Sequence, residues 1–311
     1  NEHGPRATGV WITKGGDAPS LVTATREVIL AAGAVASPQI LQLSGIGEAG
    51  LMQQLGAAPV IDLPGVGYNL QDHLQIRTIY KVSNTTTLNP RVNSLVGKAM
   101  MGLEYLLFKT GPLTMPPSQL GAFAKSDEAQ PTPNMEWHVQ PLSLDQFGSP
   151  LHRFNAITPS VCNLRPASRG AITAQSLDPL MAPKINLNYL SNPEDEAIAL
   201  AGLRMTRRIM KAKALARFSP EEWKPGPERQ SDAELLDAAR DLGTTIFHPV
   251  GTCKMGADPA AVVDDRLMVH GCKGLRVIDA SIMPLITSGN TNAPTVMIAE
   301  KGAQFNIEDA G

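Results

Sequence analysis

The fold is decided by residues 27–47, EVILAAGAVASPQILQLSGIG. This stretch starts with an aliphatic run, which is typical of a strand covered on both faces in a parallel sheet. Gly33 follows the run and lets the backbone approach another group closely. Ser37 and Pro38 then fit the N-cap and the first turn of a helix through Leu43. A strand, a glycine turn and a helix N-terminus form a βα unit, which is a common way to present amide donors to an anionic ligand.

Outside this unit the chain alternates short strands with helices and turns, which indicates a mixed α/β (α+β) protein. Alternating or aliphatic runs predict strands over residues 8–14, 20–25, 77–82, 134–142, 156–164, 170–175 and 275–278. Periodicity and end signals predict helices over residues 99–108, 192–213, 231–243 and 293–304, and Ser231 and Glu234 are expected to form a capping box at the start of the third. The glycine-rich residues 61–72 are expected to form a loop that crosses between domains.

Composition places the chain among ordinary globular proteins. Its 311 residues suffice for one large or two ordinary domains, and 43% hydrophobic and 18% charged residues are usual values. A formal net charge of −2 gives no electrostatic reason to expect nucleic acid or an anionic membrane as partner. The longest apolar run, residues 28–36, is well short of the roughly 20 residues that span a bilayer. Three widely spaced cysteines form neither a disulfide framework nor a CxxC pair, so a reducing, cytoplasmic location is expected.

Titratable and amide side chains near the end of the chain are the candidates for chemistry. His248 precedes a proline, which favours an extended or turn backbone, and a neutral imidazole accepts a hydroxyl proton near pH 7. A histidine satisfied by a backbone carbonyl is the competing interpretation. Asn290 and Asn292 flank a threonine, where an amide either donates to a substrate oxygen or only shapes the turn. Asp279 follows an expected strand, so it is a candidate for ligand binding at the sheet edge or for an N-cap.

Four segments of the chain resemble parts of one family of flavin-dependent alcohol oxidoreductases, the glucose–methanol–choline (GMC) family. Residues 33–47 match its second signature, in which Gly-Ala is followed by Ser/Thr-Pro, aliphatic residues and Ser-Gly-aliphatic-Gly. Residues 69–73, Asn-Leu-Gln-Asp-His, look like its Asn-Leu-x-Asp-His segment, and residues 248–256 resemble its catalytic His-Pro segment. Residues 274–301 resemble its closing strand and helix, which contact the flavin.

The resemblance implies a fold, a cofactor and a set of site residues. The implied fold is a partial FAD-binding Rossmann-like domain over residues 1–72 and 248–311, with a substrate domain over residues 73–247 in which helices flank a sheet. His248 is implied to be the general base toward the alcohol, and Asn290 the second catalytic residue. The implied cofactor is FAD, and the residues implied to bind it are Asp279, Ala280, Asn292, Ala293, Pro294 and Thr295.

The resemblance also implies an activity, which is the FAD-dependent oxidation of an alcohol to an aldehyde or ketone by hydride transfer to the flavin N5. The implied electron acceptor is a quinone, a dye-like acceptor or oxygen. Within the family the chain looks most like bacterial alcohol and choline dehydrogenases. Because an aromatic content of only 5% argues against an aromatic cage for a quaternary ammonium, a primary aliphatic or aryl alcohol is preferred as substrate.

Other interpretations stay open on the sequence. Some relatives of this kind are hydroxynitrile lyases, which keep the flavin without a redox step. No Gly-x-Gly-x-x-Gly follows a strand in this sequence, and the family's first signature is missing. The chain is therefore expected to be a C-terminal portion that either needs an N-terminal chain to complete the FAD site or is a non-catalytic fragment. No metal site is expected, and His138 either lines a cavity or belongs to the core.

Overall fold

The computed structural model of this protein describes residues 4–116 and 118–310, which divide into two compact units. The first unit contains the described residues up to Asp72, together with Arg165–Ser191 and the residues from Phe247 onward. The second unit contains His73–Leu164 and Asn192–Ile246. Which unit binds the flavin and which binds the substrate stays a prediction.

The compact units place residues 165–191 differently from the predicted domains. The sequence predicted a substrate domain over residues 73–247, whereas residues 165–191 belong to the first unit. The reason is that this segment makes buried hydrogen bonds to Gln42, a residue in the helix of the βα unit. The side chain of Gln42 accepts a hydrogen bond from the backbone of Ala174 at 2.7 Å and donates to the carbonyl of Ile172 at 3.0 Å.

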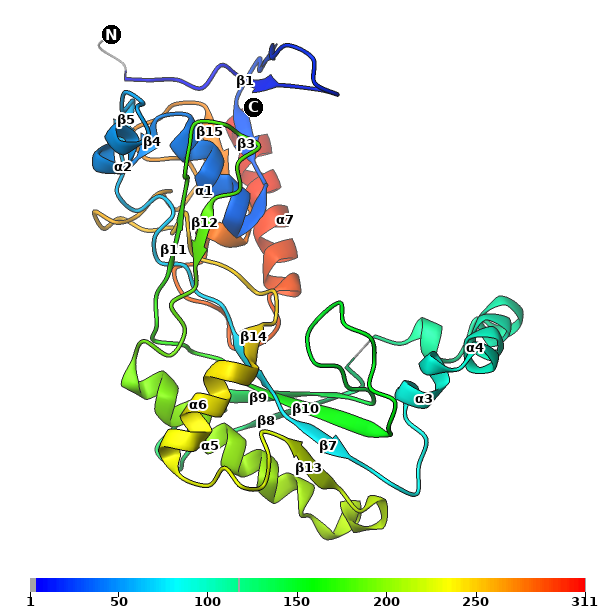
Figure 1. The fold of residues 1–311 in the computed structure, drawn as a ribbon. Helices are drawn as coiled ribbons and strands as arrows, with labels where there is room; N and C mark the ends of the chain where they lie inside the picture. Colours follow the sequence, from blue (N-terminus) through cyan, green and yellow to red (C-terminus); the bar gives the residue numbers. More distant parts are fainter. Residues whose placement is uncertain (1–3, 117, 311) are drawn as a thin grey trace. The chain divides into compact units, whose positions relative to one another are not determined.

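In the first unit, short strands pair two by two and helices pack around them (Figure 1). The strands are β1 (Gly9–Ile12), β2 (Ser20–Thr23), β3 (Val28–Leu30), β4 (Ile46–Gly47), β5 (Ile61–Asp62), β11 (Ala171–Thr173), β12 (Lys184–Asn186) and β15 (Leu275–Val277). The helices are α1 (Gly33–Leu43), α2 (Ala49–Gln54), the 3-10 helix η3 (Ala280–Ile282) and α7 (Asn292–Ala310). β1 pairs with β2 and β11 with β12 in antiparallel fashion, whereas β3 pairs with β15 and β4 with β5 in parallel.

The βα unit is present, but its helix begins earlier than predicted. α1 starts at Gly33, so the predicted N-cap at Ser37 is wrong. Pro38 lies inside the helix, where its missing N–H leaves the carbonyl of Ala34 without the usual donor four residues on. The hydroxyl of Thr252 donates to that carbonyl at 2.7 Å and satisfies it. A contact from a distant segment therefore permits a proline that the local sequence places in the first turn.

Buried aliphatic side chains from these elements form the core of the first unit. They include Leu30 of β3, Leu41 of α1, Val277 of β15 and Ile298 of α7. The expectation that the first parallel strand is covered on both faces is wrong for β3, because its central residue Ile29 is 44% exposed.

The second unit is built on one seven-stranded antiparallel sheet. The strands are β6 (Leu74–Arg77), β7 (Ile79–Lys81), β8 (Leu120–Ala124), β9 (Met135–Gln140), β10 (Ala156–Asn163), β13 (Glu221–Lys224) and β14 (Gly243–Thr245). The helices are α3 (Leu88–Asn93), α4 (Leu95–Phe108), η1 (Pro112–Thr114), α5 (Pro193–Met210), η2 (Lys213–Phe218) and α6 (Asp232–Leu242). β10 pairs with β9 on one side and with β6 and β7 on the other. Figure 1 shows α5 and α6 along one face of this sheet, while α3 and α4 stand away from it.

Side-chain caps are present at the starts of α5 and α6. The Asn192 side chain accepts a 2.9 Å hydrogen bond from the first turn of α5. Ser231 and Glu234 form the predicted capping box, with hydrogen bonds of 3.3 Å and 2.9 Å. α4 begins earlier than predicted, because the Ser94 hydroxyl caps it by accepting from a first-turn amide at 3.2 Å. None of the helices in the described residues has the length and apolarity that crossing a bilayer requires.

We expect Trp137→Phe to lower the free energy of unfolding by about 1–2 kcal/mol, the range for one buried hydrogen bond and a modest loss of packing. Trp137 is 2% exposed, and its indole N–H donates to the Thr206 hydroxyl of α5 at 2.8 Å. Urea unfolding measures the change. Trp223→Phe is the control, because Trp223 is 44% exposed and its loss is expected to cost less than about 0.5 kcal/mol. Equal losses in the two variants would show that the indole contact does not hold α5 to the sheet.

Candidate active site

His248, the predicted general base, is half-buried in a turn of the first unit. The preceding residue, Phe247, has a φ of 65°, a left-handed conformation that costs a bulky residue on the order of 1–3 kcal/mol. The backbone N–H of His248 donates to the Asp72 carboxylate at 2.9 Å. The sequence predicted a non-helical backbone at His248, and the chain is not helical there. Backbone strain that tertiary contacts maintain beside a histidine is typical of a functional site.

Gln71 and Asp72, the last two residues before the chain enters the second unit, position the turn around His248. Asp72 is buried and accepts from the hydroxyl of Tyr189 as well as from His248. The backbone of Gln71 pairs with that of Val250 in both directions, at 3.0 Å and 2.9 Å. The sequence matched this segment to a family motif without giving these residues a role. The available signal was a pair of polar residues, Gln71 and Asp72, at the end of a glycine-rich stretch.

Asn69 and Gly251 bring the two segments into direct contact. The Asn69 side-chain amide donates to the carbonyl of Gly251 at 3.2 Å. Gly251 has a φ of 91°, and a Cβ there would lie 2.6 Å from the Asn69 carbonyl oxygen. Only glycine fits here, because any other residue would be strained at this φ and its Cβ would collide with the Asn69 carbonyl oxygen. The glycine that follows the His-Pro pair therefore fixes the course of the turn.

The side chains of Asn69 and Gln71 also hold the segment that leads to Asn290. Gln71 donates to the carbonyl of Pro284 at 3.1 Å and accepts from the backbone of Ile286 at 3.2 Å, and Asn69 donates to Pro284 at 3.2 Å. Asn290 follows in an exposed turn of this unit. The two predicted catalytic residues thus lie on segments that are anchored to one short stretch of chain.

Asp279 joins the start of α1 to η3. One carboxylate oxygen accepts from the backbone N–H of Gly33 at 2.9 Å and from the Ser37 hydroxyl at 2.5 Å, and the other accepts from the Ser281 N–H at 2.8 Å. The N-cap interpretation is therefore correct, since Asp279 caps η3. The carbonyl of Ala280 accepts from Gly251 at 3.4 Å, so this junction also contacts the turn after His248. Flavin binding by Asp279 and Ala280 stays a prediction.

The beginning of α7 presents exposed polar groups. Asn292 and Ala293 are exposed, and the first turn contains no acidic residue. Both the N–H and the hydroxyl of Thr295 donate to the carbonyl of Thr291, at 3.0 Å and 2.7 Å, which stabilises this turn. Unpaired amides and the positive end of the helix dipole favour an anion at such a place. The predicted roles of Asn292 to Thr295, including Pro294, stay predictions.

Cys253 lies in the same turn but is not suited to nucleophilic chemistry. Its side chain is fully buried, and burial raises the pKa of the thiol well above its usual range. The thiolate, which is the reactive form, is therefore not populated near neutral pH. His248 remains the titratable candidate of this turn.

In the second unit, one face of the sheet is lined by buried polar side chains. Alternate residues of a strand point to opposite faces, so Glu136, His138 and Gln140 of β9 lie opposite the face that carries Trp137. Register places Arg77 of β6 on the same polar face as His138, through Ser160 of β10. Polar atoms on this face are buried without a hydrogen-bond partner: Gln75 Nε2, Arg77 Nε and Nη1, Glu136 Oε2, His138 Nε2 and Ser160 Oγ. Native proteins seldom leave such atoms unpaired, so this face is a candidate ligand surface.

Part of this face has the donor atoms of a metal site. The ligand atoms of Glu136, His138 and Cys162 lie within 4.8 Å of one another, which the structure shows for no other cluster among its described residues. The Nε2 atom of His138 is 3.3 Å from Oε1 of Glu136, too poorly oriented for a hydrogen bond. The sequence left His138 open between cavity and core, and the structure places it on the polar face. That no metal binds here stays a prediction.

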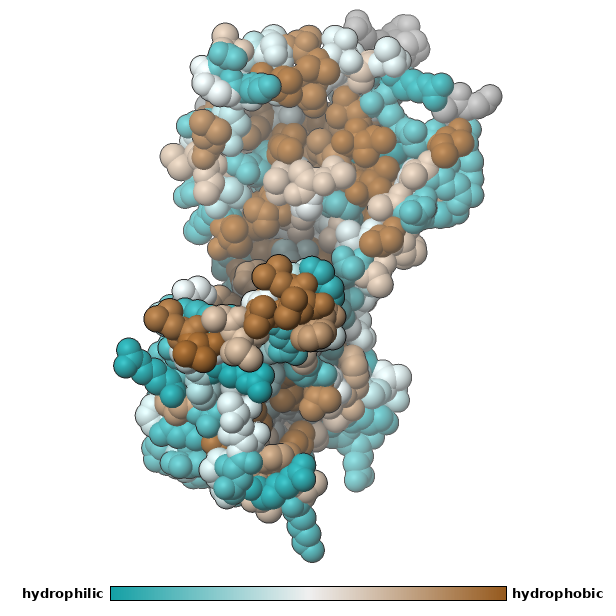
Figure 2. Space-filling model, turned by 90° about the vertical axis from the view of Figure 1, so that its right-hand side faces the viewer, coloured by the Kyte–Doolittle hydropathy of each residue, from teal (hydrophilic) through white to brown (hydrophobic). Residues whose placement is uncertain are grey.

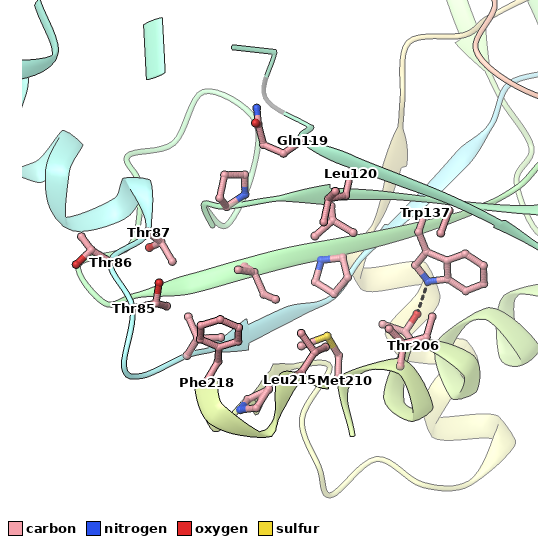
Figure 3. A pocket seen from close by; sticks show the side chains of 18 residues that line it. Thr85, Thr86, Thr87, Gln119, Leu120, Trp137, Thr206, Met210, Leu215 and Phe218 are labelled. Atoms are coloured by element: carbon pink, nitrogen blue, oxygen red, sulfur yellow. Dashed lines mark hydrogen bonds between the residues drawn. The ribbon is translucent and has the colours of Figure 1, made fainter. Parts of the chain in front are cut away.

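An apolar cavity of about 360 Å³ lies on the opposite face of the sheet. Figure 3 shows Trp137 and Leu120 of the sheet facing Met210, Leu215 and Phe218 across it. Its lining contains neither a carboxylate nor a histidine, lysine, arginine, tyrosine or cysteine. The cavity therefore lacks a group for proton transfer, and it is not a candidate for the catalytic centre.

Comparisons with known proteins agree on one family. Residues 1–75 and 166–299 match the N-terminal and C-terminal models described as GMC oxidoreductase. The chain is 42% identical over 304 residues to an alcohol dehydrogenase (acceptor) from Pseudomonas putida, covering 97% of this chain and 55% of the relative. It is 43% identical over 301 residues to an oxygen-dependent choline dehydrogenase from Klebsiella pneumoniae, covering 96% of this chain and 54% of the relative. The chain spans about half the length of the curated relatives it matches.

Solved structures give the same result. Pyridoxine 4-oxidase from Mesorbium loti superposes with a TM-score of 0.81 at 29% identity, over 97% of this chain and 55% of that one. Formate oxidase from Aspergillus oryzae RIB40, an enzyme whose FAD is subject to modification, gives a TM-score of 0.89 at 27% identity, over 98% of this chain and 58% of that one.

Proposed function

Because this chain belongs to the GMC oxidoreductase family, we propose that it is the catalytic part of an FAD-dependent oxidoreductase that acts on the CH–OH group of an alcohol. The observation that carries the proposal is the fixed turn around His248, whose backbone is bound by Asp72 and Gln71. A relative named as an alcohol dehydrogenase and another named as a choline dehydrogenase support the same reaction class.

The residues of the first unit fit a flavin. The exposed first turn of α7, free of acidic residues, suits an anionic pyrophosphate. Just before it, Thr287 has a buried hydroxyl without a hydrogen-bond partner. A Cβ on Gly289 would meet nothing within 4 Å, so a planar group has room to approach the backbone there. Asn292, Ala293, Pro294 and Thr295 would hold the cofactor, with Asp279 and Ala280 at the neighbouring junction.

His248 would act on the alcohol hydroxyl. A neutral imidazole accepts the hydroxyl proton as the C–H bond breaks, and general bases of this kind contribute about 10²–10⁴ to the rate. A bound flavin would supply the acceptor for the hydride of the alcohol carbon. Asn290 would donate its amide hydrogen to the substrate oxygen, which stabilises negative charge without a change of protonation. The Asp72 carboxylate accepts from the backbone N–H of His248 and so fixes the course of the chain at this residue.

The sequence assigned substrate binding to residues 73–247, and within this range the polar face of the second unit offers buried donors without a hydrogen-bond partner. Arg77 is 4% exposed, its Nη2 donates to Gln140 at 3.2 Å, and its Nε and Nη1 have no hydrogen-bond partner. A buried cation with two unpaired donors favours a substrate oxygen. We therefore favour a neutral alcohol with a second oxygen over choline. Turnover of an alcohol panel with a dye acceptor, with the aldehyde product quantified, tests this preference; choline as the best substrate would contradict it.

Arg77→Met is expected to raise KM for the preferred alcohol about tenfold or more, because a hydrogen bond to a charged group contributes about 1.5–3 kcal/mol. The maximal rate of flavin reduction is expected to stay within about threefold, since Arg77 binds rather than reacts. Steady-state and stopped-flow kinetics separate the two quantities. The exposed Arg153 of the same unit provides the matched control, Arg153→Met, which is expected to change neither. An unchanged KM in Arg77→Met rules out recognition by this face.

A further inference from the structure

Helix α4 (Leu95–Phe108) turns its apolar side chains toward solvent. Leu95 is 85% exposed and Leu106 is 69% exposed, whereas only Met101 of this helix is buried. A surface helix normally buries its apolar stripe against the core. This helix packs against α3 and η1 and stands away from the sheet of its unit (Figure 1). Its exposed apolar face therefore has no partner within the described part of the unit.

Six of the eight large exposed apolar residues of α4 form one face, and the other two, Tyr105 and Phe108, lie outside it. At about 100° per residue the six fall within an arc of about 140°, which is the width of a helix face built to contact an apolar phase. The residues of this face are Leu95, Val96, Met100, Leu103, Leu106 and Leu107. Leu113 and Met115, in and just after η1, are also exposed and extend the apolar surface beyond the helix. Figure 2 views the molecule from the side on which α4 lies in Figure 1. Hydrophobic side chains gather on the part of the molecule that is nearest to the viewer.

The fully exposed charges beside this face are basic. Lys98 and Lys109 are exposed and fall on one edge of the apolar arc. Arg91 of α3 is exposed as well. Glu104 is half-buried, because its carboxylate lies against Gly111. The exposed charges from Arg91 to Met115 are therefore all positive, although the whole chain carries a formal charge of −2.

We propose that α4 docks the protein on the surface of a membrane that contains anionic lipids. The apolar arc would enter the boundary between headgroups and acyl chains, while the lysine side chains extend to the lipid phosphates. The overall charge of the chain does not oppose this contact, because interactions between exposed charges are screened beyond about 10 Å at 0.1 M salt.

The charges favour a lipid surface over a second copy of this chain. A symmetric dimer through this face would bring the same patch of both copies together. Lys98 and Lys109 of each copy would then meet a surface with no exposed acidic residue between Arg91 and Met115. Like charges at an interface are unfavourable, whereas anionic headgroups supply the missing negative charge.

Vesicle flotation of the flavin-loaded protein tests this proposal, with vesicles of phosphatidylcholine alone or mixed with phosphatidylglycerol. The wild-type protein is expected to float with the mixed vesicles. The double variant Leu103→Glu/Leu106→Glu is expected to bind at least tenfold more weakly, because two leucines leave the apolar phase. Lys98→Glu/Lys109→Glu is expected to lose the preference for phosphatidylglycerol. Leu180→Glu, at a leucine that is 88% exposed in the first unit, is the control and is expected to bind like the wild type.

All variants are expected to keep their flavin spectrum and their activity with a soluble acceptor, which shows that they are folded. Absence of flotation by the wild-type protein overturns the proposal. Equal flotation of the wild type and the double leucine variant overturns it too. A leucine variant that converts a dimer into a monomer without any change in flotation assigns the face to a second copy instead.

Discussion

His248→Ala is expected to slow the reduction of bound flavin by the alcohol about 10²- to 10⁴-fold, the range that a general base contributes. The variant is expected to bind its flavin normally, because the contacts of this segment to Asp72 and Gln71 use backbone atoms at His248 and Val250. The loss should be smaller at high pH, where more of the substrate hydroxyl is ionised. Anaerobic stopped-flow absorbance, mixing oxidised protein with alcohol, measures the rate directly.

His270→Ala provides the matched control, because His270 lies in the same unit and its ring contacts the Gly256 carbonyl at 3.0 Å. It represents the competing interpretation, a histidine that only satisfies a backbone group. Its replacement is expected to change stability but not the rate of flavin reduction. If the two variants reduce flavin at the same rate as the wild type, His248 is not the base.

Asp279→Ala is expected to lower the free energy of unfolding by about 3–5 kcal/mol. The buried carboxylate accepts from Gly33, Ser37 and Ser281, and each donor left unpaired costs about 1–3 kcal/mol. The flavin is expected to dissociate more readily as well, since the junction between α1 and η3 loosens. Denaturant unfolding and the flavin released on ultrafiltration measure the two effects.

Asp258→Ala is the control for this substitution. Asp258 is exposed and pairs with Lys254 at 2.9 Å, so its loss is expected to leave both stability and flavin binding nearly unchanged. An Asp279→Ala protein as stable as the wild type would show that these hydrogen bonds do not hold the junction of α1 and η3 together.

Local patterns predicted the elements of this fold better than their boundaries and partners. The capping box of Ser231 and Glu234 appeared as expected, because its hydrogen bonds lie within one helix turn. The start of α1 did not, because the proline that suggested a first turn is accommodated by the hydroxyl of Thr252, far away in the sequence. Residues 165–191 joined the first unit through side-chain contacts of Gln42 that no local pattern reveals.

In the candidate site too, single residues could be predicted from the sequence, whereas contacts between distant segments could not. His248, Asn290 and Asp279 stood out in the sequence by residue type and by family resemblance. Asn69 and Gln71 did not, because their amides act by joining segments that are widely separated in the chain. The polar face of β9 was within reach of the alternating pattern, but only the fold showed that its side chains are buried beside Arg77.

The same holds for α4, which the sequence predicted as a helix. An apolar helix pattern usually indicates the face that meets the core. Here the buried residue is Met101, and the wide apolar face that includes Leu103 and Leu106 is exposed. Sequence periodicity gives the face, and only the packing of α3 and η1 determines which way it points.

The most direct test of the proposed function is the visible absorption spectrum of the purified protein before and after an alcohol is added without oxygen. We expect oxidised flavin bands that bleach on addition of a primary alcohol, with one aldehyde formed per flavin reduced. A protein without flavin bands, or one whose bands no alcohol changes, would contradict it.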